Sequence, residues 1–135
     1  MTPPTAPLTS PAAGDRAAAA VSSHLTVLKK RSDFLAAARA RRAAVAGFLL
    51  QARQRGSDEP ADGIRVGFTC SKKIGNAVAR NRAKRRLRAL AREILSERGQ
   101  SGWDYVLVGK PQATIARDYA DLQQDLHAAL SRIHG

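Results

Sequence analysis

The feature that most constrains the fold is a basic segment that carries the apolar spacing of a helix. Residues 63–92 include ten basic residues and neither Asp nor Glu. From the second half of this segment to just beyond its end, apolar residues recur at intervals of 4, 3 and 4 positions: Ala83, Leu87, Leu90 and Ile94. This spacing lines one face of an α-helix, which predicts a helix packed on a core with its cationic side exposed. A folded basic surface of this kind indicates a polyanionic partner.

The positive charges on this side of the helix repel one another and lower the stability of the helix, so their presence indicates a function. Like charges at positions i and i+4, such as Lys84 and Arg88, destabilise a helix by about 0.2–0.5 kcal/mol per pair. A face kept only for solubility usually mixes charges of both signs. Arg outnumbers Lys here by six to one, and the planar guanidinium group suits phosphates and bases. The pattern therefore favours structured nucleic acid.

Composition fits one small domain. The chain has 135 residues, of which 44% are hydrophobic, and a formal net charge of +12. The lone Cys70 cannot form an intramolecular disulfide, and the three histidines lack the spacing of metal ligands. No apolar run approaches the length that spans a bilayer, and the first residues lack a signal-peptide pattern. We therefore expect a cytoplasmic protein.

The chain divides into a tail and a folded domain. Residues 1–23 are rich in Pro and Ala, and we expect them to be disordered, ahead of a single domain over 24–135. In the domain, the patterns predict a short helix capped by Ser32 and ending near Arg41. They then predict a strand over 45–52, a strand over 64–70, the basic helix to about residue 97, a strand over 103–108 and a helix over 119–133. This α-β-β-α-β-α order predicts an α+β fold with a mixed sheet packed with helices.

Residues 65–88, which read RVGFTCSKKIGNAVARNRAKRRLR, resemble the signature of the bacterial ribonuclease P protein subunit. The resemblance extends over about residues 25–133, because residues 30–34 are similar to the family's first helix and residues 103–108 to its last strand. It implies a small sheet flanked by helices. It also implies a left-handed β-α-β crossover through the basic helix, which is an exception to the usual handedness.

The resemblance implies the accessory subunit of an endoribonuclease. In this family a catalytic RNA hydrolyses a phosphodiester of precursor tRNA with magnesium, removes the 5′ leader and gives the mature tRNA 5′ end. The protein supplies no catalytic residue and raises the affinity for metal and substrate. We therefore expect magnesium to be bound mainly by the RNA, and expect the partners to be the catalytic RNA and the 5′ leader. No membrane and no obligate protein partner are expected.

Matching positions imply two RNA-binding surfaces. The surface for the catalytic RNA includes a loop and the basic helix, with these residues: Lys72, Lys73, Asn76, Arg80, Asn81, Arg82, Lys84, Arg85, Arg86 and Arg88. The surface for the single-stranded leader is a cleft between the first helix and the sheet, with these candidates: Lys30, Arg31, Phe34 and Phe48. Phe34 either stacks on a base or belongs to the core, and both interpretations stay open here. Ala38 stands where many relatives carry a second aromatic residue.

Other classes of function compete with this one. A general structured-RNA-binding, ribosome-associated protein fits the charge equally well, and only the long motif disfavours it. A basic-helix DNA-binding protein is less favoured, because neither helix-turn-helix spacing nor heptads are present. A self-contained nuclease ranks last, because the sequence offers no catalytic constellation. Cys70 is interpreted as packing, and the aspartates at 104, 118, 121 and 125 are not assigned to a metal.

Overall fold

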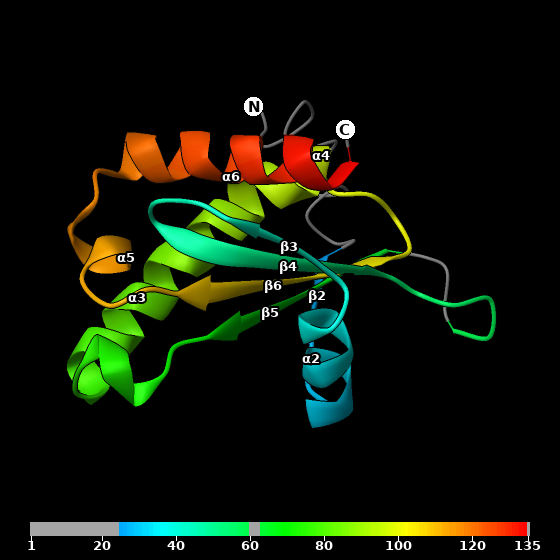
Figure 1. Cartoon of the computed structure of the whole chain (residues 1–135), viewed down its shortest axis with the longest axis horizontal. Helices are drawn as coiled ribbons and strands as arrows, with labels where there is room; N and C mark the ends of the chain where they lie inside the picture. Colours follow the sequence, from blue (N-terminus) through cyan, green and yellow to red (C-terminus); the bar gives the residue numbers. More distant parts are fainter. Residues whose placement is uncertain (1–24, 60–62, 135) are drawn as a thin grey trace, which may run out of the picture.

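The computed structural model describes residues 25–59 and 63–134 (Figure 1). The predicted tail, residues 1–23, lies outside these ranges, so the boundary between tail and domain stays a prediction. Within the described ranges, no helix has the length and apolar character needed to cross a membrane.

Five strands form one mixed sheet in the order β2-β5-β6-β4-β3. Strands β2 and β6 both pair in parallel with β5, whereas β4 pairs antiparallel with β6 and with β3. The strand bounds are β2 Leu25–Val27, β3 Arg41–Ala44, β4 Phe48–Gln54, β5 Ile64–Thr69 and β6 Trp103–Gly109. The predicted α+β fold with a mixed sheet is confirmed. The left-handed sense of the connection from β5 to β6 stays a prediction from the resemblance.

Helices pack on both faces of the sheet (Figure 1). On one face, α3 continues into the π-helical segment η2 and then α4, and α6 packs against the same core. On the opposite face lies α2. The helix bounds are α2 Arg31–Ala38, the 3-10 segment η1 Lys72–Ile74, α3 Ala77–Leu90, η2 Ala91–Leu95, α4 Ser96–Arg98, α5 Ala113–Ala116 and α6 Tyr119–His134.

The main core lies between the sheet and the helices α3 and α6. The predicted apolar stripe of the basic helix is buried in this core, since Ala83, Leu87 and Leu90 have 0% exposure and Ile94 has 5%. A smaller cluster on the other face joins Leu28, Ala37 and Val106, with Phe34 and Val108 packed against it. Because α2 is only 8 residues long, this second face of the sheet is covered over a short stretch.

The sequence pattern does not predict β2, β3 or α5. The helix expected to reach Arg41 ends at Ala38, and the residues from Arg41 to Ala44 pair with β4 instead. Arg and Ala favour helices, so pairing with the neighbouring strand decides their state here. The N-cap of α2 is Lys30, which makes no side-chain cap bond, rather than the predicted Ser32.

Gly47 lies in the turn before β4, not inside a strand as predicted. The Val45 N–H donates to the Phe48 carbonyl at 3.0 Å across this turn. A Cβ atom at Gly47 would lie only 2.2 Å from Leu122 Cδ2 of α6, and the Gly47 N–H donates to Asp125 Oδ2 at 3.1 Å. Glycine is therefore required because the turn packs closely against α6.

Candidate RNA-binding surfaces

The solvent side of α3 concentrates positive charge. Side chains on this side are exposed or half-exposed: Arg80, Asn81, Arg82, Lys84, Arg85 and Arg88, followed by Arg92 in η2. No acidic residue lies in the first turn of α3. The ion pairs of the described residues involve other arginines, namely Arg53, Arg55, Arg65 and Arg117. The α3 face, as we call this set, therefore presents its charge to solvent on a helix fixed by its buried stripe.

Arg86 differs from its neighbours on α3. Its guanidinium group donates to the carbonyl of Ile115 and, at 2.5 Å, to the carbonyl of Arg117. These bonds fasten α3 to α5 and to the residue that follows it. We therefore treat Arg86, a predicted RNA-binding residue, as a structural residue and leave it out of the α3 face.

The loop before α3 has a defined conformation that exposes two lysines. The Ser71 hydroxyl oxygen accepts from the Lys73 N–H at 3.3 Å, and Lys72 and Lys73 point their charge into solvent on η1. Gly75 has a φ of 143°, a backbone conformation that favours glycine. Asn76 is the N-cap of α3, because its side-chain oxygen accepts from the Ala79 N–H at 3.0 Å. The cap bond uses one lone pair of this oxygen, so the amide NH2 of Asn76 stays free of this bond.

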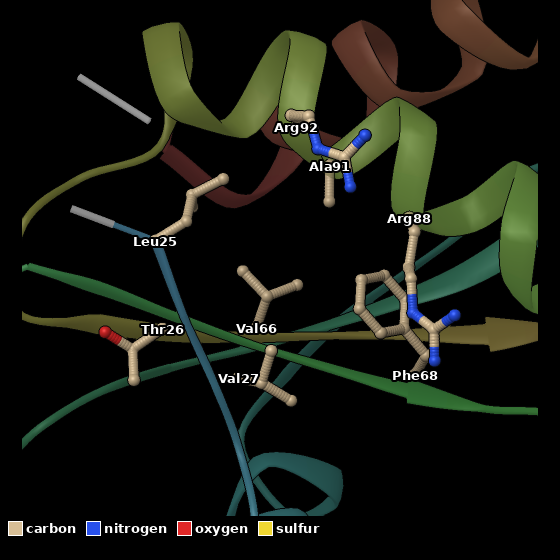
Figure 2. Close-up of a pocket in the computed structure, with 8 residues that line it drawn as sticks. All are labelled: Leu25, Thr26, Val27, Val66, Phe68, Arg88, Ala91 and Arg92. Atoms are coloured by element: carbon tan, nitrogen blue, oxygen red, sulfur yellow. The ribbon is translucent and has the colours of Figure 1, made fainter. Parts of the chain in front are cut away.

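A small pocket adjoins the α3 face, at the edge of the sheet (Figure 2). It has a volume of about 220 Å³ and is lined by Leu25, Thr26, Val27, Val66, Phe68, Arg88, Ala91 and Arg92. The Arg88 guanidinium carbon lies 5.9 Å from the centroid of the Phe68 ring. None of the predicted site residues except Arg88 lies in this pocket.

The second predicted surface lies where α2 meets the sheet. Phe34 lies directly over Gly67, where an added Cβ would be 2.5 Å from Phe34 Cε1. Phe34 is half-buried, so it serves the small core and also lines an open pocket of about 400 Å³ with Lys29, Arg31, Leu35 and Thr69. Lys30 is exposed at the start of α2 but does not line this pocket. We call this region the α2 cleft.

Phe48, the fourth candidate for the cleft, lies elsewhere. It has 0% exposure and belongs to the main core on the α3 and α6 face of the sheet. Successive residues of a strand point to opposite faces, and in β4 the register that places Leu50 in the main core places Phe48 there as well. In this structure Phe48 therefore cannot line the α2 cleft.

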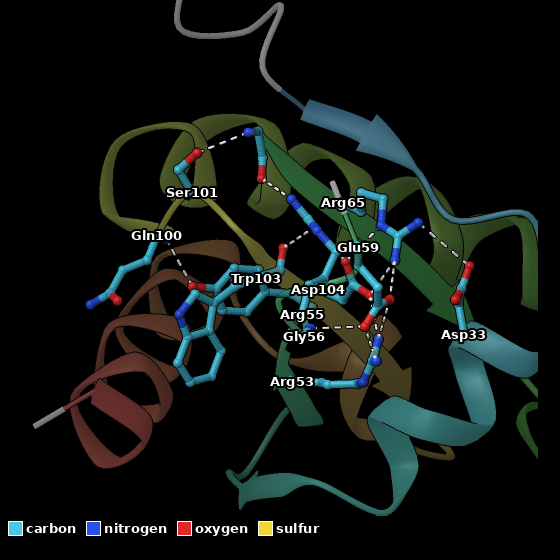
Figure 3. A network of polar contacts seen from close by, with 12 residues as sticks. Asp33, Arg53, Arg55, Gly56, Glu59, Arg65, Gln100, Ser101, Trp103 and Asp104 are labelled. Atoms are coloured by element: carbon cyan, nitrogen blue, oxygen red, sulfur yellow. Dashed lines mark hydrogen bonds and ion pairs between the residues drawn. The ribbon is translucent and has the colours of Figure 1, made fainter. Parts of the chain in front are cut away.

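A network of arginines around Asp104 borders the α2 cleft (Figure 3), and the sequence did not reveal it. Asp104 has 0% exposure and accepts from Arg65 Nε at 2.8 Å, from Arg65 Nη2 at 2.7 Å and from Arg55 Nη1 at 2.6 Å. Arg65 also pairs with Asp33 of α2 at 3.6 Å, which ties the helix to the sheet. Arg53 bonds to Glu59, and this hydrogen bond lowers the pKa of the Glu59 carboxyl.

The position of this network follows from strand register, which the sequence pattern cannot give. Asp104 pairs with Arg65 across β5 and β6 and with Arg53 across β4 and β6. The only signal in the sequence is an isolated acid in an otherwise apolar strand, since a buried carboxylate requires partners. The network fixes Arg53 and Arg65 on the sheet face that carries α2.

Among the described residues, burial disfavours the thiolate of Cys70, and the acids and histidines form no cluster suited to a metal. Burial raises the pKa of the Cys70 thiol, and the charge of Lys84 only partly offsets this. Within residues 25–59 and 63–134 there is no group of three or more His, Cys, Asp or Glu residues suited to a metal ion. Asp125 is bound by Arg117 at 2.7 Å. These observations agree with interpreting Cys70 as packing.

Comparison with known proteins points to one family. The family model for ribonuclease P matches residues 23–134 of the chain. The ribonuclease P protein component of Ruegeria pomeroyi is 59% identical over 113 residues, which cover 84% of this chain and 90% of the relative. The corresponding protein of Paramagnetospirillum magneticum is 48% identical over 115 residues, which cover 84% of this chain and 86% of the relative.

Solved structures agree with this match. The ribonuclease P protein of Thermotoga maritima has a TM-score of 0.66 at 26% identity, covering 80% of this chain and 97% of that one. The ribonuclease P protein of Staphylococcus aureus has a TM-score of 0.63 at 24% identity, covering 79% of this chain and 94% of that one. At that identity the second likeness supports the fold alone.

Proposed function

Because the chain belongs to the bacterial ribonuclease P protein family, we propose that its two basic surfaces bind two different RNA segments. As a protein component of ribonuclease P, the chain acts in the processing of tRNA 5′ ends, and its partner is the ribonuclease P RNA. The proposal assigns the α3 face to that RNA and the α2 cleft to the 5′ leader of precursor tRNA.

One observation carries the assignment of the α3 face. Its cations project from a helix whose apolar stripe is buried, so the backbone positions that carry them keep a fixed spacing. Because this helix is already folded, no backbone has to order on binding, and neutralising phosphates releases counterions from the RNA. The positive end of the helix dipole, beside Arg80 and the exposed Lys72 and Lys73, adds to the attraction for phosphate.

The α2 cleft has the chemistry that suits a single strand. Lys29 and Arg31 provide charge for phosphates at the pocket, and the exposed part of the Phe34 ring offers a surface for a base. Base–aromatic stacking is worth about 1–3 kcal/mol and tolerates any base. With Ala38 in place of a second aromatic residue, we expect leader binding to depend mainly on charge.

We place magnesium on the RNA. The described residues do not fit a magnesium ion, since they hold no group of three or more suitable ligands and since the buried Asp104 already binds Arg55 and Arg65. We assign the chemistry at the phosphodiester to the RNA, as the resemblance to the family implies. We likewise propose a cytoplasmic location, since the RNA partner and precursor tRNA act there.

Salt-dependent affinity for the Ruegeria pomeroyi ribonuclease P RNA tests the α3 face. The double variant Arg82→Gln/Arg85→Gln should bind more weakly, with a slope of log K against log salt shallower by about 2, since each lost phosphate contact removes about one unit. Arg42→Gln, a change of an exposed cation on the edge strand β3, serves as the matched control. Equal slopes for the double variant and the wild type would remove this face from the interface.

Leader dependence tests the α2 cleft. In complex with the RNA, Phe34→Leu should lose affinity for precursor tRNA carrying a leader and keep its affinity for mature tRNA, because only the leader reaches the cleft. The thermal midpoint of the variant must be measured alongside, because Phe34 also packs on the small core. An equal loss for both tRNAs would contradict the assignment.

A further inference from the structure

We propose that the pocket between β2, β5 and the end of α3 binds one unpaired nucleobase of the ribonuclease P RNA. This inference rests on the proposed function of the α3 face. It adds a base-binding site on the side of the sheet opposite the α2 cleft, and it makes Phe68 and Val27 RNA-binding residues.

The pocket has an apolar floor and a cationic rim (Figure 2). Val66 and Phe68 come from β5, and Val27 comes from the edge strand β2. Val27 is 59% exposed, although it is a large hydrophobic residue. Arg88 and Arg92 stand opposite, one helical turn apart. The apolar surface and the charges thus face the same small space.

This combination matches the chemistry of a nucleotide. A base offers flat faces that stack on aromatic and apolar side chains, and its phosphate requires cations. The described lining contains no carboxylate, and its two charged groups are both guanidinium groups. An apolar peptide in the pocket would leave these two guanidinium groups without a counterion. The volume of about 220 Å³ is below the roughly 300–1,000 Å³ of pockets that hold drug-sized ligands, so it suits one base rather than a longer segment.

The position of the pocket also indicates which RNA supplies the base. Lys84, Arg88 and Arg92 follow one another at intervals of four residues, so they lie along one side of the helix. From Arg80 to Arg92 the helix rises by roughly 18 Å, enough for several successive phosphates. A strand bound along the α3 face therefore reaches the pocket at its far end. Only an unpaired base can enter it, because paired bases stay stacked within a duplex.

The rival occupant is the chain's own N-terminal segment, which joins β2 at the pocket. Residues 1–24 contain no aromatic residue and a single acid, Asp15. That composition offers no Phe, Tyr or Trp ring to stack on Phe68 and a single carboxylate for the two arginines. The pocket therefore fits RNA better than the N-terminal segment, and the test below includes a variant that lacks this segment.

The test combines affinity with base-specific chemical probing of the Ruegeria pomeroyi ribonuclease P RNA. Phe68→Leu and Val27→Thr each remove stacking or apolar contact while keeping similar volume. Phe68→Leu should weaken binding by at least about fivefold, because stacking of a base on an aromatic ring is worth a factor of that size or more. Val27→Thr removes an apolar contact and should weaken binding by less, and both variants should leave the salt slope unchanged. Arg92→Gln should instead make the slope shallower by about 1. Arg42→Gln, which changes an exposed cation on the other edge strand, β3, is the matched control for Arg92→Gln.

Probing identifies the base itself. One unpaired nucleotide should be protected in the wild-type complex and reactive with Phe68→Leu, while the protein keeps its thermal midpoint. Unchanged affinity and protection in both pocket variants, with wild-type binding intact, would overturn the inference and leave the proposed function standing. Loss of the Phe68→Leu effect on deleting residues 1–22 would assign the pocket to the tail and overturn it too. Failure of the wild type to bind this RNA would overturn the proposed function as well.

Discussion

Replacing Asp104 by asparagine is the most informative test of how the sheet holds its arginines. The Asp104 carboxylate has 0% exposure and contacts Arg55 Nη1 at 2.6 Å, in a pair whose side chains are 1% and 0% exposed. It also holds Arg65 through two hydrogen bonds, at 2.8 Å and 2.7 Å. Asn has nearly the same shape, so Asp104→Asn removes the negative charge and replaces one of the two acceptor oxygens with an NH2 donor.

The loss of unfolding free energy in Asp104→Asn is set mainly by Arg55. Breaking a buried ion pair by removing one partner costs about 3–5 kcal/mol. Arg55 keeps hydrogen bonds to the carbonyls of Trp103, at 3.1 Å, and Gly63, at 2.6 Å, and the side chain of Arg65 is 24% exposed and regains water. The lower end, about 3 kcal/mol, therefore applies. This is a large share of the roughly 5–15 kcal/mol that stabilises a typical domain.

Thermal and urea unfolding of Asp104→Asn and the wild type measure this cost. We expect the thermal midpoint to fall by about 10 °C, since 1 kcal/mol corresponds to roughly 4 °C in a domain of this size. Glu59→Gln, which removes an acid on the surface of the same network, should leave the midpoint nearly unchanged. A variant at Asp104 as stable as the wild type would refute the view that this carboxylate holds the network together.

Three further substitutions have defined outcomes. Burial and nearby arginines lower the pKa of His134, so the unfolded state binds the proton more readily than the folded state. The free energy of unfolding should therefore fall as the pH drops below about 6.5. Thermal melts of His134→Gln should show a weaker dependence of the midpoint on pH. Gly67→Ala should cost about 1–3 kcal/mol by overpacking against Phe34, and adding Phe34→Leu should recover part of that in urea unfolding. Arg86→Gln should lower stability by about 1.5–3 kcal/mol with little change in the salt slope of RNA binding, whereas Arg85→Gln should do the reverse.

Long periodic segments were predictable because one physical signal dominates them. The stripe of α3 and that of α6 each repeat over several turns, so burial leaves a clear 3-and-4 spacing. Strands β5 and β6 were found within one residue of their ends, because each is an apolar run bounded by turn residues. The cations of the α3 face followed from the same periodicity, since fixing the buried side fixes the exposed side.

Elements and contacts that depend on distant partners were not predictable. Strand β3 consists of two Arg and two Ala residues, and only pairing with β4 makes it a strand. The arginines around Asp104 meet through the register of three strands, which single-strand patterns do not specify. Phe48 was predicted to be more typical of strand core and only a weak candidate for the cleft, and its place in the main core agrees with the first of these interpretations.

Single-turnover cleavage of precursor tRNA tests the central claim most directly. The Ruegeria pomeroyi ribonuclease P RNA is assayed at low magnesium, with and without the wild-type chain, on substrates with a long leader and with a leader of one nucleotide. The chain should accelerate cleavage, and more so for the long leader. Arg82→Gln/Arg85→Gln should need a higher protein concentration for the same rate, and Phe34→Leu should lose only the advantage of the long leader. Cleavage unaffected by the wild-type chain, or identical behaviour of all three proteins, would contradict the assignment of the two surfaces.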